Sequence, residues 1–303
     1  MTGSGLILID KPDGMTSHDV VARVRKAAGT RKVGHAGTLD PMATGLLIVG
    51  VNSSTRLLTY IVGADKEYLA TIRLGAGSTT DDAEGDLLAP VSQHALDAVA
   101  DDAIAAGIAT LTGEIQQIPS AVSAIKVDGK RAYARVRAGE QVELAPRAVT
   151  VSEFELLATR RIDGAIDLDV RVVCSSGTYI RSLARDLGTS LAVGGHLTAL
   201  RRTRVGVFSV RDAHDLATLD AEAALIPAVD AATDLFERLD LTEQQAIDLT
   251  HGRRIHVADR EGPGGEPVAA VAPNGALVGL IEFRGKEART LVNFPTDEAV
   301  GRA

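Results

Sequence analysis

Apolar residues near the start of the chain form short runs that predict strands and a spaced pattern that predicts a helix. The apolar runs at 6–9 and 46–49 predict two short, buried strands. Between them, the spacing of Thr16 and Asp19 is that of a helix capping box, and apolar residues follow at helical intervals until Gly29. A strand, a helix and a second strand are therefore expected in this part of the chain.

The middle of the chain contains both strand-like alternation and helix-like spacing of apolar residues. Residues 66–75, KEYLATIRLG, alternate in polarity, so Tyr68 is expected on the apolar face of a strand. The other elements expected here are an alanine-rich helix at 93–112, paired strands at 148–157 and 165–174, and a helix at 178–192.

The pattern changes again after residue 212. An acidic stretch is expected to be helical and to end near Leu239. The short apolar runs RRIHV, PVAAVA, ALVGLIEF and TLVNF follow, separated by Gly, Pro and Asn, which is typical of a small all-β domain. The sequence thus predicts a larger domain over 1–239 and a small one over 240–303.

The composition narrows the class of protein. Apolar residues make up 45% and charged residues 24%, as in an ordinary soluble globular protein. No apolar run approaches the ~20 residues that span a bilayer, and the first residues lack the basic start of a secretory signal. The single cysteine, Cys174, excludes an internal disulfide. Since the histidines show no ligand spacing either, no metal is expected, and the cytoplasm is the expected compartment.

The net charge of −8 conceals a segregated distribution. Residues 171–211 hold seven arginines and one acid, and residues 120–150 hold six Lys or Arg and three acids. Acids gather instead in 81–102 and 212–248. Such segregation gives an acidic chain one basic face suited to nucleic acid, although solvated helix faces produce the same counts.

The stretch GHAGTLDPMATG, residues 34–45, places one carboxylate in an unusual setting. Pro41 fixes its own φ angle and favours an extended conformation at Asp40, while three glycines allow tight turns and close approach. The stretch therefore predicts a stiff loop that carries Asp40 just before a core strand. On the residues alone, an ordinary Asp-Pro turn at the surface is the commoner explanation.

Four stretches, taken in their order along the chain, favour a functional role for Asp40 over a surface turn. They are DKPDGMTS (10–17), GHAGTLDPMATG (34–45), KEYLATIRLG (66–75) and SSGTYIRSLARDLG (175–188). Together they resemble the TruB family of tRNA pseudouridine synthases, and the resemblance continues through IPSAVSAIKVDGKRAY (118–133) and HLTALRRTRVG (196–206). It implies an α+β pseudouridine synthase fold, with a mixed, largely antiparallel central sheet flanked by helices and loops. The C-terminal region resembles a PUA-type RNA-binding domain more weakly.

The resemblance also implies a reaction. The substrate is uridine 55 in the T-loop of tRNA, which is isomerised to pseudouridine without a cofactor. The C1′–N1 bond breaks, the base rotates and it rejoins the sugar through C5. A carboxylate is suited to begin this as a nucleophile or a base, and Asp40 matches that residue. The sequence leaves open whether Asp40 attacks C1′, adds to C6 or removes the C2′ proton.

Three further residues match family positions beside the target base. Arg181 is expected to keep the Asp40 carboxylate charged in a pocket that excludes water. Tyr68 is expected to stack on the flipped uracil, as aromatic side chains do in RNA recognition. His35 is expected to occupy the space that the flipped nucleotide leaves.

Other matches are implied at the pocket wall or on the RNA backbone. Leu200 and Tyr179 match pocket walls, and Lys11 is expected to support the catalytic loop or to contact a phosphate. An RNA-clamping insertion is expected at about 118–148, with Val122 where many members have tyrosine. Phosphate contacts are expected from Lys126, Lys130, Arg131, Arg135, Arg137, Arg201 and Arg202.

Three alternatives remain at this point. A non-catalytic tRNA-binding or tRNA-folding chaperone would use the same scaffold, although Asp40 and Arg181 are both retained. A guide-RNA-dependent enzyme would work in a multi-protein particle. The insertion is instead typical of the stand-alone bacterial form, expected as a monomer with the tRNA T-arm as partner and no guide RNA or obligate protein. A hydrolase acting on a nucleoside or glycoside usually needs two carboxylates, and the nearby acids of the matched motifs, Asp10 and Asp19, do not lie in a comparable glycine-bounded loop.

Overall fold

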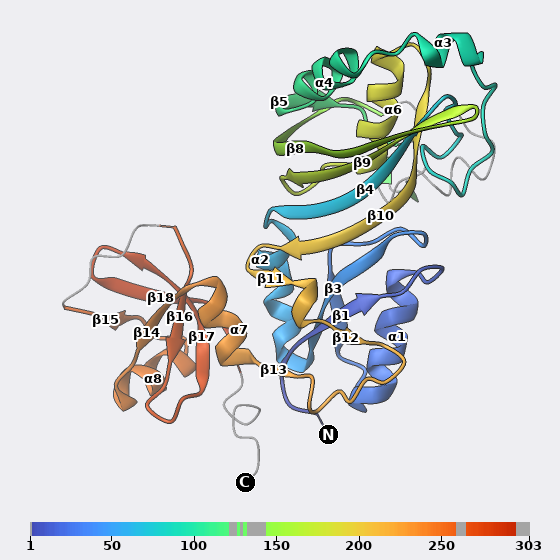
Figure 1. Ribbon diagram of the computed structural model, residues 1–303. Coiled ribbons are helices and arrows are strands. Elements are labelled where there is room, and N and C mark those ends of the chain that lie inside the picture. Colours follow the sequence, from blue (N-terminus) through green and yellow to red (C-terminus); the bar gives the residue numbers. More distant parts are fainter. Residues whose placement is uncertain (1, 121–125, 128–129, 132–143, 259–264, 295–303) are drawn as a thin grey trace. The chain divides into compact units, whose positions relative to one another are not determined.

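The computed structural model describes residues 2–120, 126–127, 130–131, 144–258 and 265–294. The chain divides into two compact units. The terminal unit comprises residues 1–40, 46–62 and 207–303, and the central unit comprises residues 41–45 and 63–206. The chain therefore passes from the terminal to the central unit directly after Asp40; Figure 1 colours the chain along its sequence.

The first part of the terminal unit is a small sheet covered by short helices. β1 (Gly5–Lys11) lies beside β3 (Thr44–Val51), and β2 (Val33–Ala36) pairs antiparallel with β3. β12 (His214–Asp215) and β13 (Ile226–Pro227) pair with β1. The remaining elements are α1 (Ser17–Ala28), η1 (Asn52–Arg56), α2 (Leu58–Val62), β11 (Phe208–Ser209) and η2 (Val210–Asp212).

Helix α1 begins and ends where the sequence predicts. The Thr16 side chain accepts the Asp19 N–H, and the Asp19 carboxylate accepts the Thr16 N–H, which completes the capping box. Gly29 ends the helix in the left-handed conformation, with φ 63°. Because these signals are local, they fix the first turn of α1, which carries Ser17.

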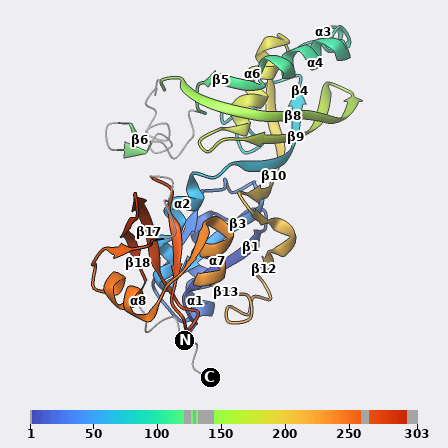
Figure 2. The same cartoon turned by 90° about the vertical axis from the view of Figure 1, so that its left-hand side faces the viewer.

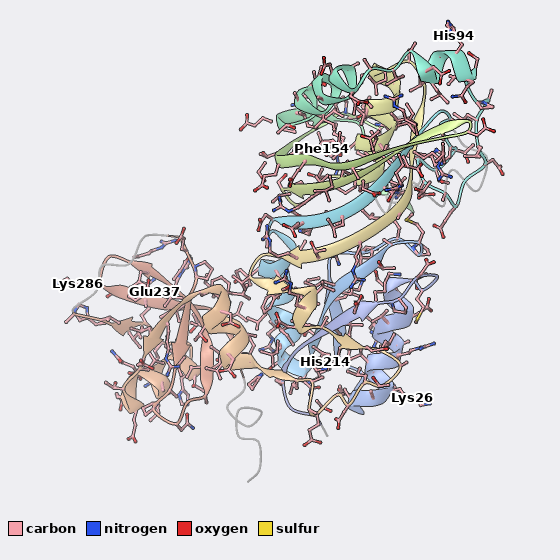
Figure 3. The ribbon with its side chains drawn as sticks, in the orientation of Figure 1. Lys26, His94, Phe154, His214, Glu237 and Lys286 are labelled. Carbon is pink, nitrogen blue, oxygen red and sulfur yellow. The ribbon has the colours of Figure 1, made fainter. Side chains whose placement is uncertain are left out.

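The second part of the terminal unit is a five-stranded sheet in the order β14–β16–β17–β18–β15. Its strands are β14 (Glu237–Asp240), β15 (Ile255–His256), β16 (Val268–Val271), β17 (Leu277–Arg284) and β18 (Glu287–Asn293). α7 (Ala228–Leu235) packs on β16 and β17, and α8 (Glu243–Thr250) packs on β17 and β18. Figure 3 labels Glu237 at the start of β14 and Lys286 between β17 and β18.

The short strands predicted after residue 240 are confirmed, but the helix predicted before it is wrong in most of its length. Only α7 is helical between 212 and Leu239. The flanking residues pair instead with distant strands, as β12 and β13 do with β1 and as β14 does with β16. These long-range pairings override a local pattern that reads as helix. Helix α8 was not predicted, although Thr242 and Gln245 form a capping box.

The central unit is built on an antiparallel sheet in the order β5–β8–β9–β4–β10. Its strands are β4 (Lys66–Leu74), β5 (Gly113–Gln117), β8 (Arg147–Ile162), β9 (Ala165–Cys174) and β10 (Gly195–Val205), and β6 (Lys126–Val127) pairs separately with β7 (Lys130–Arg131). Thr44 and Gly45 add a parallel pairing to β10. The predicted mixed, largely antiparallel sheet is therefore confirmed.

Two of the three helices in the described part of the central unit pack together over the sheet. α6 (Ile180–Ser190) packs on β10 and β4, and α4 (Asp101–Thr110) packs on α6 and β8, so that the two lie side by side in both views (Figures 1 and 2). Phe154 on β8, labelled in Figure 3, is buried in this core. The first turn of α6 carries Arg181.

The single helix expected at 93–112 is two helices, α3 (Gln93–Asp97) and α4. Ala100 between them is extended, and Val99 is buried. Arg161 on β8 donates a hydrogen bond to the Val99 carbonyl at 2.8 Å and pairs with Asp101 at 2.7 Å. This distant arginine satisfies a carbonyl that a continuous helix would bond internally, which explains the break.

Candidate active site

The residue before Asp40 is clamped by a buried serine. The Ser17 hydroxyl donates to the Leu39 carbonyl at 3.1 Å and accepts the Leu39 N–H at 2.9 Å. Ser17 is 1% exposed and Leu39 4% exposed, so both bonds are shielded from water. Asp40 itself is half-buried. The first turn of α1 thus holds the backbone on one side of the carboxylate, and Pro41 restricts it on the other.

Two expected site residues precede Asp40 in the sequence. Lys11 is fully buried, and its ammonium donates to the carbonyls of Pro12 and Met15 at 2.9 and 2.6 Å. These contacts suit support of the 12–15 turn rather than a phosphate. His35 lies on β2 opposite Val49, and its ring meets the His18 ring edge-on with centroids 5.7 Å apart.

Gly45 ends the Asp40 stretch at a place where no side chain fits. Its φ is 97°, and a Cβ there would lie 2.2 Å from the carbonyl oxygen of Arg202. The glycine therefore allows the protein's own backbone to approach. The close approach that the sequence analysis expected of the glycines is, at Gly45, an approach to the backbone of Arg202. Gly37 supplies the other positive φ of the stretch, 80°.

In the central unit, Tyr68 lies on the buried face of β4, as the alternation predicts. It is 7% exposed and stands opposite Arg202 on β10 and Val172 on β9. Leu200, also 7% exposed, stands opposite Ala70 on the same strand pair. The structure thus brings Tyr68 and Leu200 to one face of two neighbouring strands.

Arg202 is 1% exposed, which does not suit the phosphate contact expected of it. The β10 register directs it to the same side as Tyr68. Its neighbour Arg201 is half-buried, and its guanidinium lies 3.5 Å from the Thr44 hydroxyl. We therefore assign Arg202 to the interior and not to the RNA surface.

A buried lysine stands two residues before Tyr68. Lys66 is 6% exposed, and its ammonium donates to the Ala64 carbonyl at 2.6 Å. Burial, and then the charge of Arg202, lowers the pKa of Lys66 to about 8. Cys174 stands opposite Lys66, and burial raises the pKa of its thiol to about 11. No chemistry is expected of such a thiol.

Arg181 is held by a buried carboxylate that the sequence analysis did not name. Its guanidinium lies 3.3 Å from the Asp82 carboxylate and donates to the Thr80 carbonyl at 3.0 Å. Both side chains are buried, at 5% and 2% exposure. The Glu84 N–H and the Thr80 hydroxyl also donate to Asp82. Such a desolvated, well-bonded pair fixes both groups in place.

The neighbouring residues repeat this arrangement. Arg185, one turn along α6, pairs with Asp81 at 3.2 Å and donates to the Ile118 carbonyl at 2.7 Å. Burial raises the pKa of Asp81, which Arg185 partly offsets. Tyr179 is the N-cap residue of α6. Asp81 and Asp82 lie in the acidic segment 81–102, in which the sequence analysis named no site residue.

Only some of the residues that are expected to contact phosphates lie in the described part of the chain. The backbones of Lys126, Lys130 and Arg131 form the β6–β7 pair. Arg135 and Arg137 lie outside the described residues, as does Val122. Within the described part of the chain, no group of three His, Cys, Asp or Glu side chains is placed to hold a metal, and no helix is long and apolar enough to cross a membrane.

Family models match most of the chain. Residues 25–180 match the TruB family pseudouridylate synthase N-terminal domain, residues 181–240 the tRNA pseudouridylate synthase B C-terminal domain, and residues 236–295 the tRNA pseudouridine synthase II C-terminal domain. The chain belongs to the TruB family. As a TruB member it is a tRNA pseudouridine synthase, an isomerase.

Curated relatives agree over the full length. The tRNA pseudouridine synthase B of Leifsonia xyli subsp. xyli (strain CTCB07) is 76% identical, over 98% of this chain and 99% of the relative. The protein of that name from Arthrobacter sp. (strain FB24) is 53% identical, over 99% of both.

Two solved structures share the fold of this TruB protein. One is from an H/ACA RNP bound to a substrate RNA containing 2′-deoxyuridine, with 26% identity, a TM-score of 0.70, and coverage of 98% of this chain and 87% of that one. The other is from a Cbf5–Nop10–Gar1 complex, with 27% identity, a TM-score of 0.71, and coverage of 97% and 86%.

Proposed function

We propose that the protein isomerises uridine 55 in the T-loop of tRNA to pseudouridine, with Asp40 as the catalytic carboxylate. The observation that carries this proposal is the clamp on the Asp40 loop. Ser17 satisfies both polar backbone atoms of Leu39, and Pro41 restricts the backbone of Asp40, the residue between them. A carboxylate on a backbone fixed from both sides is preorganised for attack in one direction.

The proposed reaction conserves every atom of the substrate. The C1′–N1 bond breaks, the uracil rotates and a C1′–C5 bond forms; C5 loses its proton and N1 ends protonated. Asp40 starts the reaction as a nucleophile or a base. The target nucleotide must leave its stack first, because a stacked base does not expose the bond to a side chain.

Arg181 and Tyr68 serve the reacting centre in this proposal. Arg181 keeps the Asp40 carboxylate charged where water is excluded. Its burial and its bonds to Asp82 and Thr80 support this role, because they hold a permanent positive charge in one orientation. Tyr68 stacks on the uracil, and its place on a rigid central strand supports such a platform.

The remaining pocket residues bind the displaced nucleotide and its loop. His35 takes the place that the flipped base leaves, and its edge-on contact with His18 supports a fixed ring orientation. Leu200 and Tyr179 line the pocket.

The rest of the chain binds RNA in the same proposal. Residues 240–303 form an RNA-binding domain in addition to the catalytic domain, residues 1–239. The chain acts in the cytoplasm as a monomer, without a guide RNA or an obligate protein partner. Phosphates are contacted by Lys126, Lys130, Arg131, Arg135, Arg137 and Arg201.

A tritium-release assay tests the substrate and the position. Transcribed tRNA carries tritium at C5 of its uridines, and each conversion releases one tritium. We expect stoichiometric release from wild-type tRNA and none from a transcript with cytidine at position 55, which should still bind. Release from the cytidine transcript would refute the assignment of position 55, and binding without release from either transcript would favour an RNA-folding role.

A further inference from the structure

Residues 117–120, at the end of β5, contact the segments that carry and bind Arg181. Gln117 is 1% exposed, although Gln116 before it is exposed. The Gln117 amide makes two hydrogen bonds with the backbone of Tyr179: its Nε2 donates to the Tyr179 carbonyl at 3.0 Å, and its Oε1 accepts the Tyr179 N–H at 2.8 Å. A side chain thus supplies the pair of bonds that a neighbouring strand would make.

This contact fixes the entry to α6. Tyr179 is the N-cap residue of α6, with an extended backbone (φ −104°, ψ 109°) and no cap bond from its own side chain. Arg181 follows in the first turn. Because Gln117 holds both polar backbone atoms of Tyr179, it determines where the first turn starts and the direction in which Arg181 leaves the helix.

A second contact joins Ser120 to Thr80, one of the residues that bind Arg181. The Thr80 carbonyl accepts two hydrogen bonds, one from the Arg181 guanidinium at 3.0 Å and one from the Ser120 hydroxyl at 3.2 Å. Ser120 is 1% exposed. Ser120 therefore holds the same oxygen that orients Arg181, two residues before Asp82.

We propose that Gln117 and Ser120 are positioning residues of the isomerisation, acting through Arg181. Gln117 fixes the backbone from which Arg181 projects, and Ser120 fixes the carbonyl on which its guanidinium rests. Neither needs to touch the RNA. This inference rests on the proposed role of Arg181 in catalysis.

The test compares Gln117→Ala with Gln116→Ala in the full-length protein. Single-turnover rates are measured at saturating enzyme, and T-arm RNA affinity and the urea midpoint are measured in parallel. We expect Gln117→Ala to slow turnover by about 10- to 100-fold, as misplacement of a reacting group by about 1 Å does, with little change in affinity. Gln116→Ala should match wild type.

Three further variants guard against a folding defect. Gln117→Glu keeps the shape and the acceptor but replaces the donor to the Tyr179 carbonyl, so it should also be slow while it stays folded. Ser120→Ala should be slow to a smaller extent, and Ser120→Thr, which keeps the hydroxyl, should restore the rate.

A double variant separates positioning from general support. In an Arg181→Ala background, Gln117→Ala should slow the reaction no further, because the group it positions is gone. An equal slowing in both backgrounds, or a wild-type rate for Gln117→Ala alone, would overturn the inference. If Arg181→Ala alone keeps the wild-type rate, the proposed role of Arg181 falls instead.

Discussion

The Asp40 loop and the surroundings of Arg181 are held in place by different means. Asp40 lies between a serine clamp and a proline, and the clamp comes from the first turn of α1, whose ends are set by local signals. Arg181 is instead held by Asp82 and Thr80, which are distant in the sequence, inside a buried ionic pair.

The difference separates two ways of fixing a functional group. A neutral backbone clamp buries no charge, so losing one bond is a limited penalty. A buried ion pair leaves a desolvated charge when one partner is removed, which is costly. Substitutions in the two regions should therefore lower the free energy of unfolding by different amounts. Only for the buried ion pair should that loss depend on whether the partner is replaced as well.

The largest effect is expected for the Arg181–Asp82 pair. Asp82→Leu or Arg181→Met alone should lower the free energy of unfolding by about 3–5 kcal/mol, because each leaves a buried charge without its partner. The double variant should regain most of that stability but turn over no faster than Arg181→Met alone. Urea unfolding and single-turnover tritium release measure the two properties. Additive destabilisation in the double variant would show that the two residues are not coupled.

The Ser17 clamp should give the next largest effect. Ser17→Ala leaves the buried N–H and carbonyl of Leu39 without that partner, at a cost of about 2 kcal/mol in unfolding free energy. Turnover should fall about 10-fold because the Asp40 loop is less restrained. An unchanged rate with lowered stability would mean that the clamp supports the fold and not the reaction.

The buried cation beside Tyr68 predicts a pH-dependent stability. Lys66 titrates at about 8 in the folded chain, against an ordinary 10.5. Above pH 8 the unfolded chain holds a proton that the folded chain has released, so the free energy of unfolding rises with pH, by at most about 1.4 kcal/mol per unit.

Between pH 8 and 9 the effect of Lys66 on stability can be measured apart from that of Cys174. The Cys174 thiol titrates at about 11 when folded and ordinarily at 9.0, so above pH 9 it lowers stability as pH rises. Urea unfolding at both ends of the window should show the rise in wild type. The control variant Lys26→Met, which replaces an exposed lysine on α1, should show the same rise. Lys66→Met should abolish it, and an equal rise in Lys66→Met would assign it to another group.

The smallest effect is expected at the cap of α1. Thr16→Ala removes one capping bond and should cost about 1 kcal/mol of unfolding free energy. The rate should stay at the wild-type value, because Ser17 keeps both of its bonds to Leu39. Tritium release and urea unfolding measured together test this, and a rate loss comparable to that of Ser17→Ala would mean that the whole helix end, rather than Ser17, restrains the loop.

Sequence patterns were sufficient where the deciding contacts are local. The capping box of α1, the alternation in β4 and the strand pair β8–β9 all follow from neighbouring residues, and the structure has them. The break between α3 and α4 depends on Arg161, and β14 depends on pairing with β16. No local pattern records such partners.

The site follows the same division. Asp40, Tyr68 and Arg181 stand in motifs that the family resemblance identifies. Asp82 and Gln117 were missed because their burial depends on α6, far along the chain. Arg202 was expected at the surface because its register on β10, which decides the face of a strand residue, is a tertiary property.

The most direct test of the account is the single-turnover rate of Asp40→Asn, which keeps the shape of the side chain and removes its charge. T-arm RNA labelled with tritium at C5 is mixed with excess enzyme, and RNA affinity is measured on the same preparation. We predict affinity close to that of wild type and no tritium release. Release at the wild-type rate would contradict the assignment of Asp40 as the catalytic carboxylate.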